Sequence, residues 1–181
     1  MKLLGSYSTA YITPSLFQLY DPLYGNTELM PEDNRTIEGG IEFSRGKNFR
    51  VSAVYFNRNE ENYVDFVTID PENFVSQYQN IDDTFESSGV EVEVFVKILE
   101  NLTGSANYTN TKADERFALR IPEHKANAAI SYLWSKQTTV GLSYQYVGDR
   151  DDSFFNPNTF ENETITLDSF SLLNFNISGQ L

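Results

Sequence analysis

The residue types that most often carry chemistry are scarce in this sequence of 181 residues. It contains no Cys, which excludes disulfides and Cys-based metal sites, and its single histidine, His124, follows Pro122 near the start of an expected strand. A histidine in such a place is more often structural or exposed than catalytic. No serine stands in a G-x-S-x-G turn, and there is no Gly-rich phosphate-binding loop. We therefore expect no catalytic residue and no enzyme activity.

Acidic pairs offer the one hint of a metal site. Asp82 with Asp83, and Asp151 with Asp152, fall in expected long loops, and their oxygens are ligands that Ca²⁺ prefers. The spacing matches no EF-hand loop, so we favour solvated loops and expect no metal or cofactor. The formal net charge of −13 argues against a nucleic acid partner, because phosphate binding needs a basic surface. A cationic ligand would suit this charge better, although a solvated acidic surface is the simplest interpretation.

The elements that position these residues are predicted by a strict alternation of apolar and polar side chains, which is typical of β-strands. In 89–97, four valines at even positions oppose Glu91, Glu93 and Lys97. Val54 and Phe56 break the alternation of another strand. No segment has a helical period over about ten residues. Eight strands are predicted, each around one of the alternating stretches 3–11, 37–43, 49–55, 89–97, 102–109, 125–134, 139–146 and 173–178.

The lengths of strands and connections point to a membrane. The strands have roughly 9–12 residues, which is what a tilted strand needs to cross a bilayer. Long connections, at 12–34, 59–80, 110–123 and 148–167, alternate with short ones near 44–47, 100–101 and 135–136. This asymmetry is typical of outer-membrane β-barrels, whose long loops are extracellular and whose short turns are periplasmic. We therefore predict an all-β, antiparallel transmembrane barrel.

Aromatic residues fit this orientation as two membrane girdles. Trp134 lies at the expected periplasmic end of its strand, whereas Tyr108, Tyr144 and Tyr146 lie toward the extracellular ends of theirs. The residues alone leave two alternatives. One is a complete eight-stranded barrel with a structural or adhesion role. The other is a soluble β-sandwich that binds carbohydrate on a platform of tyrosines.

One segment resembles a known family closely. Residues 6–32 read SYSTAYITPSLFQLYDPLYGNTELMPE, and TIEGGIEF follows at 36–43. These words resemble a stretch that TonB-dependent receptors carry late in their barrel, with Thr27 where that family usually has Pro. Five later motifs also resemble motifs of that family and follow in the same order. They are YFNR at 55–58, NID at 80–82, SGVEVE at 88–93, RIPEHK at 120–125 and YQYVGDR at 144–150. Within the family, the chain looks most similar to cobalamin and ferric-siderophore receptors.

The resemblance implies an incomplete receptor. Such receptors are roughly 22-stranded barrels around a plug domain, so residues 1–181 would be a partial barrel domain. A signal peptide is expected to be missing, because only Leu3 and Leu4 are apolar before a polar run at the N-terminus. By resemblance, the plug and the final strands of the barrel are expected to be missing as well. By resemblance, the parent protein lies in the outer membrane of a Gram-negative bacterium, contacts its lipid, and takes up a scarce nutrient with energy delivered by TonB through the plug region.

The resemblance also implies where a ligand binds, because extracellular loops of the family contact the ligand. The residues that we expect to do so here are Phe17, Tyr20, Asp21, Tyr24 and Asn26, the aromatic rings giving stacking area and Asp21 giving polarity. Packing of this loop against its neighbours is the equally weighted alternative. No His lies between Pro14 and Pro31, so haem ranks below a ferric siderophore or cobalamin.

Overall fold

The computed structural model describes residues 1–114 and 118–179. They divide into two compact units, one made of residues 1–5, 38–56 and 88 onward, and the other of residues 6–37 and 57–87. Nearly all regular structure is β-strand, and the one helix in the described part of the chain, α1 (Leu16–Tyr20), has five residues. Within this part, no helix is long and apolar enough to span a membrane.

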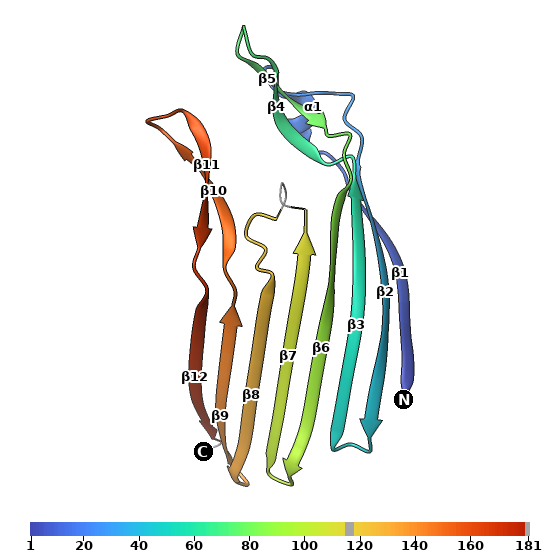
Figure 1. The fold of residues 1–181 in the computed structure, drawn as a ribbon, viewed down its shortest axis with the longest axis vertical. Coiled ribbons are helices and arrows are strands. Elements are labelled where there is room, and N and C mark those ends of the chain that lie inside the picture. Colours follow the sequence, from blue (N-terminus) through green and yellow to red (C-terminus); the bar gives the residue numbers. More distant parts are fainter. Residues whose placement is uncertain (115–117, 180–181) are drawn as a thin grey trace. The chain divides into compact units, whose positions relative to one another are not determined.

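Eight strands form the main sheet, in the order β1-β2-β3-β6-β7-β8-β9-β12 (Figure 1). Consecutive strands of this sheet are thus neighbours in the chain, apart from the two hairpins that interrupt it. The eight strands predicted from alternation are confirmed, and three of them, β2, β3 and β6, are longer than expected, with 14, 13 and 15 residues. Their bounds are β1 Lys2–Ile12, β2 Glu32–Arg45, β3 Phe49–Glu61, β6 Phe85–Leu99, β7 Leu102–Ala113, β8 His124–Ser135, β9 Thr138–Val147 and β12 Phe170–Gly179.

Two of the stretches predicted as irregular loops contain further strands, so that part of the prediction was wrong. Residues 59–80 contain the hairpin of β4 (Val64–Asp70) and β5 (Val75–Asn80). Residues 148–167 contain the hairpin of β10 (Arg150–Asn156) and β11 (Glu161–Leu167). Polar residues occupy both faces of these short strands, so they lack the alternation of a strand with one buried face.

The other two long connections also differ from the prediction. Within 12–34, α1 forms and β2 begins at Glu32 rather than at Arg35. In the connection at 110–123, β7 continues to Ala113, and residues 115–117 lie outside the described part of the chain. The short turns are found where they were expected, and Gly46 adopts a positive φ of 60° in the first of them.

The register of the last strands separates an apolar face from a polar face, because side chains alternate along each strand. On one face, the cross-strand rows of β7, β8, β9 and β12 are Tyr108/Ala126/Tyr146/Ser171, Ala106/Ala128/Tyr144/Leu173, Gly104/Ile130/Leu142/Phe175 and Leu102/Tyr132/Val140/Ile177. On the other face, they are Asn107/Asn127/Gln145/Leu172, Ser105/Ala129/Ser143/Asn174 and Thr103/Ser131/Gly141/Asn176.

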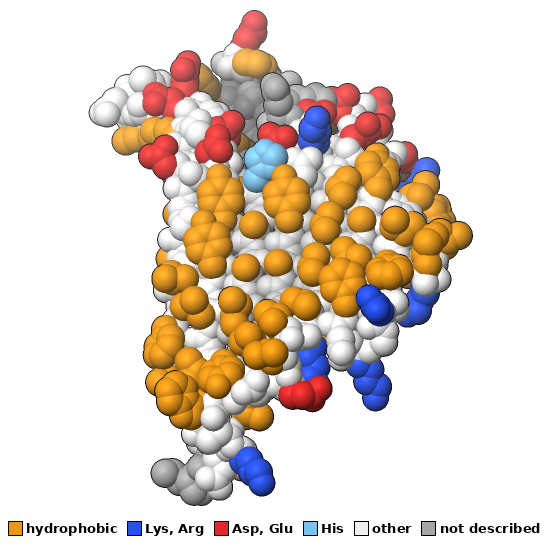
Figure 2. Space-filling view, turned by 60° about the horizontal axis from the view of Figure 1, so that its bottom comes forward, with side chains coloured by type: hydrophobic (Ala, Val, Ile, Leu, Met, Phe, Trp, Pro, Cys, Tyr) orange, Lys and Arg blue, Asp and Glu red, His pale blue; other side chains and the backbone are white. Residues whose placement is uncertain are grey.

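The apolar face is exposed, and Figure 2 shows its hydrophobic side chains spread over one side of the molecule. Trp134, Phe175 and Ile177 are 72%, 66% and 63% exposed. Among the described residues, only Leu29, Val64 and Val147 are buried hydrophobic side chains. A water-soluble domain with so much exposed apolar surface would aggregate. The arrangement instead suits a sheet whose apolar side faces lipid.

Val54 and Phe56, the two residues that break the alternation, lie against glycines of neighbouring strands. A Cβ on Gly40 of β2 would lie 2.8 Å from Cγ2 of Val54, and a Cβ on Gly89 of β6 would lie 2.6 Å from the Phe56 ring. The two large side chains therefore occupy the space that the missing side chains leave on the adjacent strands. This packing explains why apolar residues occur where alternation predicts polar ones.

Candidate functional site

The predicted ligand-binding loop begins with a capped helix. Ser15 caps α1 by accepting a hydrogen bond from the Gln18 backbone N–H at 3.2 Å, and its own N–H donates to Oε1 of Gln18 at 2.7 Å. This reciprocal capping box satisfies two N–H groups that the first turn leaves free. It fixes the position of the helix that carries Phe17 and Tyr20.

Polar side chains then shape the rest of the loop. Oδ1 of Asp21 accepts hydrogen bonds from the N–H groups of Leu23 and Tyr24, at 3.0 and 2.9 Å. Oδ1 of Asn26 accepts one from the N–H of Glu28 at 2.9 Å, and its Nδ2 donates to the Tyr78 carbonyl at 3.0 Å. Two of the five predicted ligand contacts thus hold the backbone of the loop in place.

Gly25 is required for the same turn. A Cβ there would lie 2.6 Å from both the N and the O of Asp21, closer than real Cβ contacts come. The N–H of Gly25 also donates to the Asp21 carbonyl at 2.9 Å. Glycine is therefore required within the segment LYGN at 23–26, because a side chain at Gly25 would push the backbone of this turn apart.

The loop packs on the β4–β5 hairpin through aromatic rings. Phe17 and Tyr78 meet edge to face with centroids 6.1 Å apart, and Tyr24 and Phe66 do the same at 5.3 Å. Phe66 and Tyr78 lie 5.1 Å apart and join the two pairs. Sequence analysis missed both hairpin residues. The β-branched and aromatic residues in VDFVTID, at 64–70, favour a strand and are the signal that could have revealed it, although they do not alternate.

Asn80 completes the attachment between loop and hairpin. Its Oδ1 accepts from the Met30 N–H at 2.8 Å, while its Nδ2 donates to the carbonyls of Met30 and Asn62, at 3.0 and 2.7 Å. Gln77 adds a bond from its Nε2 to the Gly25 carbonyl at 2.8 Å. Because so many polar groups are satisfied, the surface of this unit is preformed rather than loose.

Two predicted residues keep large free surfaces on this rigid base. Tyr20 is 66% exposed and Phe17 is 55% exposed, while Tyr24 is 41% exposed. The structure thus divides the predicted set. Asp21 and Asn26 shape the loop, and the three aromatic side chains remain exposed on it. Whether a ligand binds there remains a prediction.

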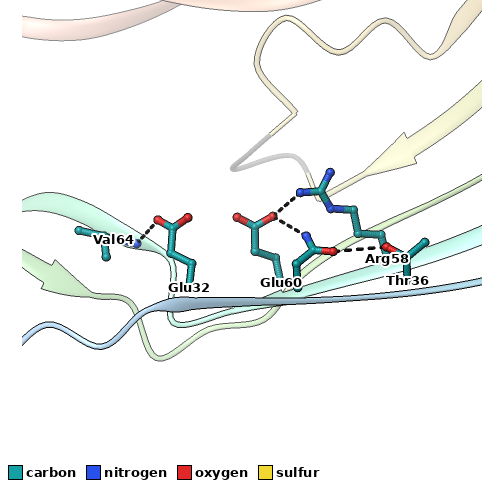
Figure 3. Close-up of polar contacts among 6 residues, drawn as sticks. Glu32, Thr36, Arg58, Glu60 and Val64 are labelled. Carbon is teal, nitrogen blue, oxygen red and sulfur yellow. Dashed lines mark hydrogen bonds and ion pairs between the residues drawn. The ribbon is translucent and has the colours of Figure 1, made fainter. Parts of the chain in front are cut away.

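A polar cluster in the same unit was also missed by sequence analysis (Figure 3). Glu60 is only 8% exposed, and its Oε2 accepts hydrogen bonds from Nη2 of Arg58 at 2.9 Å and Nδ2 of Asn34 at 3.2 Å. Close by, Oε1 of Glu32 accepts from the Val64 N–H at 2.9 Å. A buried carboxylate needs such partners, because desolvation penalises its charge.

These carboxylates also affect a neighbouring phenol. Burial raises the pKa of the Tyr63 hydroxyl, and the charges of Asp65, Glu32 and Glu60 raise it further. The phenol therefore stays protonated at neutral pH. The cluster presents fixed donors and acceptors in this unit.

The acidic pair Asp151 and Asp152 has structural partners. Oδ1 of Asp151 accepts from the Thr166 hydroxyl at 2.8 Å, and Oδ1 of Asp152 accepts from Nε of Arg120 at 2.8 Å. The Arg120 hydrogen bond lowers the pKa of the Asp152 carboxyl. Throughout residues 1–114 and 118–179, no group of three or more His, Cys, Asp or Glu side chains is arranged to hold a metal ion.

His124 and the predicted girdle residues lie on the apolar face of the sheet. The Tyr108 hydroxyl is 2.8 Å from Nδ1 of His124, with the two rings stacked at 6.1 Å, which makes a structural role of His124 the simplest interpretation. Tyr144 and Ser171 share a hydroxyl hydrogen bond of 2.8 Å. Trp134 lies one residue before the end of β8, and Tyr146 one residue before the end of β9. Their contact with the membrane interface remains a prediction.

Comparison with known proteins agrees with this geometry. The family model "TonB dependent receptor-like, beta-barrel" matches residues 1–181. The vitamin B12 transporter BtuB of Vibrio cholerae is 29% identical over 184 residues, which cover 96% of this chain and 27% of that protein. The chain thus spans about a quarter of the length of the curated relatives that it matches.

Solved structures show the same fold. The pyoverdine outer-membrane receptor FpvA from Pseudomonas aeruginosa superposes with a TM-score of 0.74 at 18% identity, covering 97% of this chain and 27% of FpvA. A copper transporter, OprC, gives a TM-score of 0.74 at 14% identity, covering 99% of this chain and 30% of OprC. The family is one of outer-membrane receptors and transporters of Gram-negative bacteria, and not of enzymes. This chain belongs to the TonB-dependent receptor-like β-barrel family.

Proposed function

We propose that the chain is part of the barrel wall of a receptor that takes up a ferric siderophore or cobalamin across the outer membrane, driven by TonB. The rest of the parent receptor supplies the plug and the segment that contacts TonB. In this proposal, residues 1–181 contribute one sector of the wall and one sector of the ligand-binding surface.

The observation that carries the proposal is the aromatic surface of the loop at 12–31. Phe17, Tyr20 and Tyr24 present rings on a base that hydrogen bonds hold rigid. Rigid aromatic side chains lose little conformational entropy when they bind, and they suit large organic ligands. The similarity to a vitamin B12 transporter over nearly the whole chain supports the same ligand class.

Copper is a second candidate, because one structural relative is described as a copper transporter. Copper ions are held by imidazole, thiolate or thioether ligands. The whole sequence has no Cys, one His and two Met. Aromatic area, rather than a set of metal ligands, is what this sector offers, so we place an organic complex first.

Uptake by the full-length protein tests the proposal. The protein is expressed in a Gram-negative host that lacks its own cobalamin and siderophore receptors, and radiolabelled cyanocobalamin, ferric siderophores and copper are supplied separately. We expect accumulation of one organic complex in cells with active TonB and none in cells without it. Accumulation that does not depend on TonB would contradict the energised mechanism, and accumulation of copper alone would replace the ligand class.

The loop residues are tested in the same cells. Replacing Tyr20 by Ala removes a ring that is 66% exposed and should weaken ligand binding without harming the fold. Ile37→Ala is a matched control, because Ile37 lies on the same unit, is 58% exposed and belongs to β2 rather than to the loop. Equal binding by the two variants would remove the loop from the site.

A further inference from the structure

Positive side chains gather at the end of the main sheet where the short turns lie. Three of them, Arg45, Lys47 and Lys136, lie at or in the turns that join β2 to β3 and β8 to β9. All three are exposed, and all belong to the same compact unit. We call these three residues the basic rim. Both turns lie at the same end of the sheet, so the three charges border one edge of it (Figure 1).

The two carboxylates in and beside the short turns already have partners. Nζ of Lys2 lies 2.9 Å from Oε1 of Glu42, and Nζ of Lys97 lies 2.5 Å from Oε2 of Glu100. The basic rim, in contrast, forms no ion pair with any residue that the structure describes. Its positive charges are therefore available to another molecule.

The other end of the same unit has the opposite charge. Residues 148–168, which lead from β9 through the β10–β11 hairpin to β12, contain six Asp or Glu residues and one Arg. In outer-membrane barrels the long loops are extracellular and the short turns are periplasmic. A negatively charged partner of the basic rim therefore lies on the periplasmic side of the membrane.

The basic rim borders the apolar face of the sheet. Arg45 comes two residues after Phe43 in β2, on the same face, and Phe43 is 50% exposed. Lys136 comes two residues after Trp134, which is 72% exposed. Figure 2 shows Lys and Arg side chains along the lower edge of the hydrophobic surface. At such an edge, the alkyl part of a basic side chain lies on apolar surface while its charge reaches the level of the lipid headgroups.

We propose that the basic rim binds the phosphates of anionic phospholipids in the periplasmic leaflet, and that it selects such lipids over zwitterionic ones. Charge complementarity supports this partner, because each Lys or Arg beside an anionic lipid surface strengthens association about fivefold. The guanidinium of Arg45 also offers two parallel N–H donors to one phosphate. The anionic glycolipids of the outer leaflet are disfavoured, since they border the acidic end of the unit.

Spin-labelled lipids test the proposal with the full-length receptor in phosphatidylcholine vesicles. Electron spin resonance compares the affinity of the lipid shell around the protein for labelled phosphatidylglycerol and for labelled phosphatidylcholine. We expect a preference of about twofold for phosphatidylglycerol, averaged over the whole shell, and its loss at high salt, because salt screens exposed charges. The variant Arg45→Gln/Lys47→Gln/Lys136→Gln should lose most of this preference.

A matched control removes two Lys and one Arg from the opposite end of the unit. Lys112, Arg120 and Lys125 are exposed there, and replacing all three by Gln changes the net charge by the same amount. This control should keep the preference. Exchanging Arg for Lys and Lys for Arg in the basic rim should keep it as well, because the charges remain. Heat-modifiable gel mobility verifies that each variant is folded.

Three results would overturn the proposal. They are equal affinity of the wild type for the two lipids, an unchanged preference in the variant that lacks the basic rim, and an equal loss of preference in that variant and in the matched control. The proposal depends on the outer-membrane location of the family and not on the nutrient that the receptor takes up. Failure of the uptake experiment would therefore leave it standing.

Discussion

Gly39 and Gly40 are adjacent in β2, yet a methyl group would meet opposite surroundings at the two positions. A Cβ on Gly39 finds nothing within 4 Å. A Cβ on Gly40 would lie 2.5 Å from the carbonyl oxygen of Ala53 and 2.8 Å from Cγ2 of Val54. The pair of variants Gly39→Ala and Gly40→Ala therefore measures the effect of close packing between β2 and β3 with the chemistry of the substitution held constant.

Both variants gain about 0.5–1 kcal/mol, because alanine loses less backbone entropy on folding than glycine. Gly40→Ala also incurs an overpacking cost of about 1–3 kcal/mol. Val54 can rotate away, but the Ala53 oxygen is part of the backbone of the neighbouring strand and cannot move without disturbing the sheet. Since the entropy gain is common to both, the difference between the variants should equal the overpacking cost.

Urea titration of the full-length receptor in lipid vesicles measures this difference, with tryptophan fluorescence and heat-modifiable mobility as two readouts. We expect Gly39→Ala to be as stable as the wild type or more stable, and Gly40→Ala to be less stable than Gly39→Ala by about 1–3 kcal/mol. Adding Val54→Ala to Gly40→Ala should recover only part of the loss. Equal stability of the two single variants would refute the packing described for Val54.

Three further predictions concern two loops and Glu60 near the end of β3. Gly25→Ala should open the turn that Asp21 stabilises, because its Cβ would collide with backbone atoms, and an external protease should then cut this loop faster in intact cells. Glu60→Ala should lower the free energy of unfolding by about 1–2 kcal/mol, since it strips Arg58 of its partner, and Glu60→Gln should lower it less in the same urea assay. The Arg120 contact should depend on pH. It is present above the ordinary carboxyl pKa and is lost as pH falls through the lowered pKa of Asp152, so a spin label at Ile121 should become more mobile in acid. A label whose mobility is the same at every pH would contradict the last prediction.

How much the sequence predicts depends on what surrounds each strand. The strands at 89–97 and 139–146 contact an apolar medium on one side and a polar one on the other, so their side chains alternate and reveal them. The hairpins β4–β5 and β10–β11 have no such boundary, and polar residues occupy both of their faces. Their strands are held by backbone pairing, which leaves little trace in residue type.

The candidate site divides along similar lines. Tyr20 and Phe17 could be predicted as exposed loop aromatics. The roles of Asp21 and Asn26 could not, because a carboxylate that binds a ligand and one that accepts backbone N–H groups look alike in a sequence. Phe66 could not be predicted as a partner for Tyr24, since it lies 42 positions further along the chain and only the fold brings the two rings together.

The polar rows of β7, β8, β9 and β12 have a consequence for movement along the wall. From Asn107 to Thr103, and across to Gln145 and Asn176, the side chains apart from Leu172 are amides, hydroxyls and small groups, with no formal charge in these rows. A charged surface would hold a counterion in a deep electrostatic well, whereas neutral dipoles can turn to solvate either sign weakly. In the proposed receptor, passage of a solute along these rows should therefore depend little on the charge of the solute or on the salt concentration.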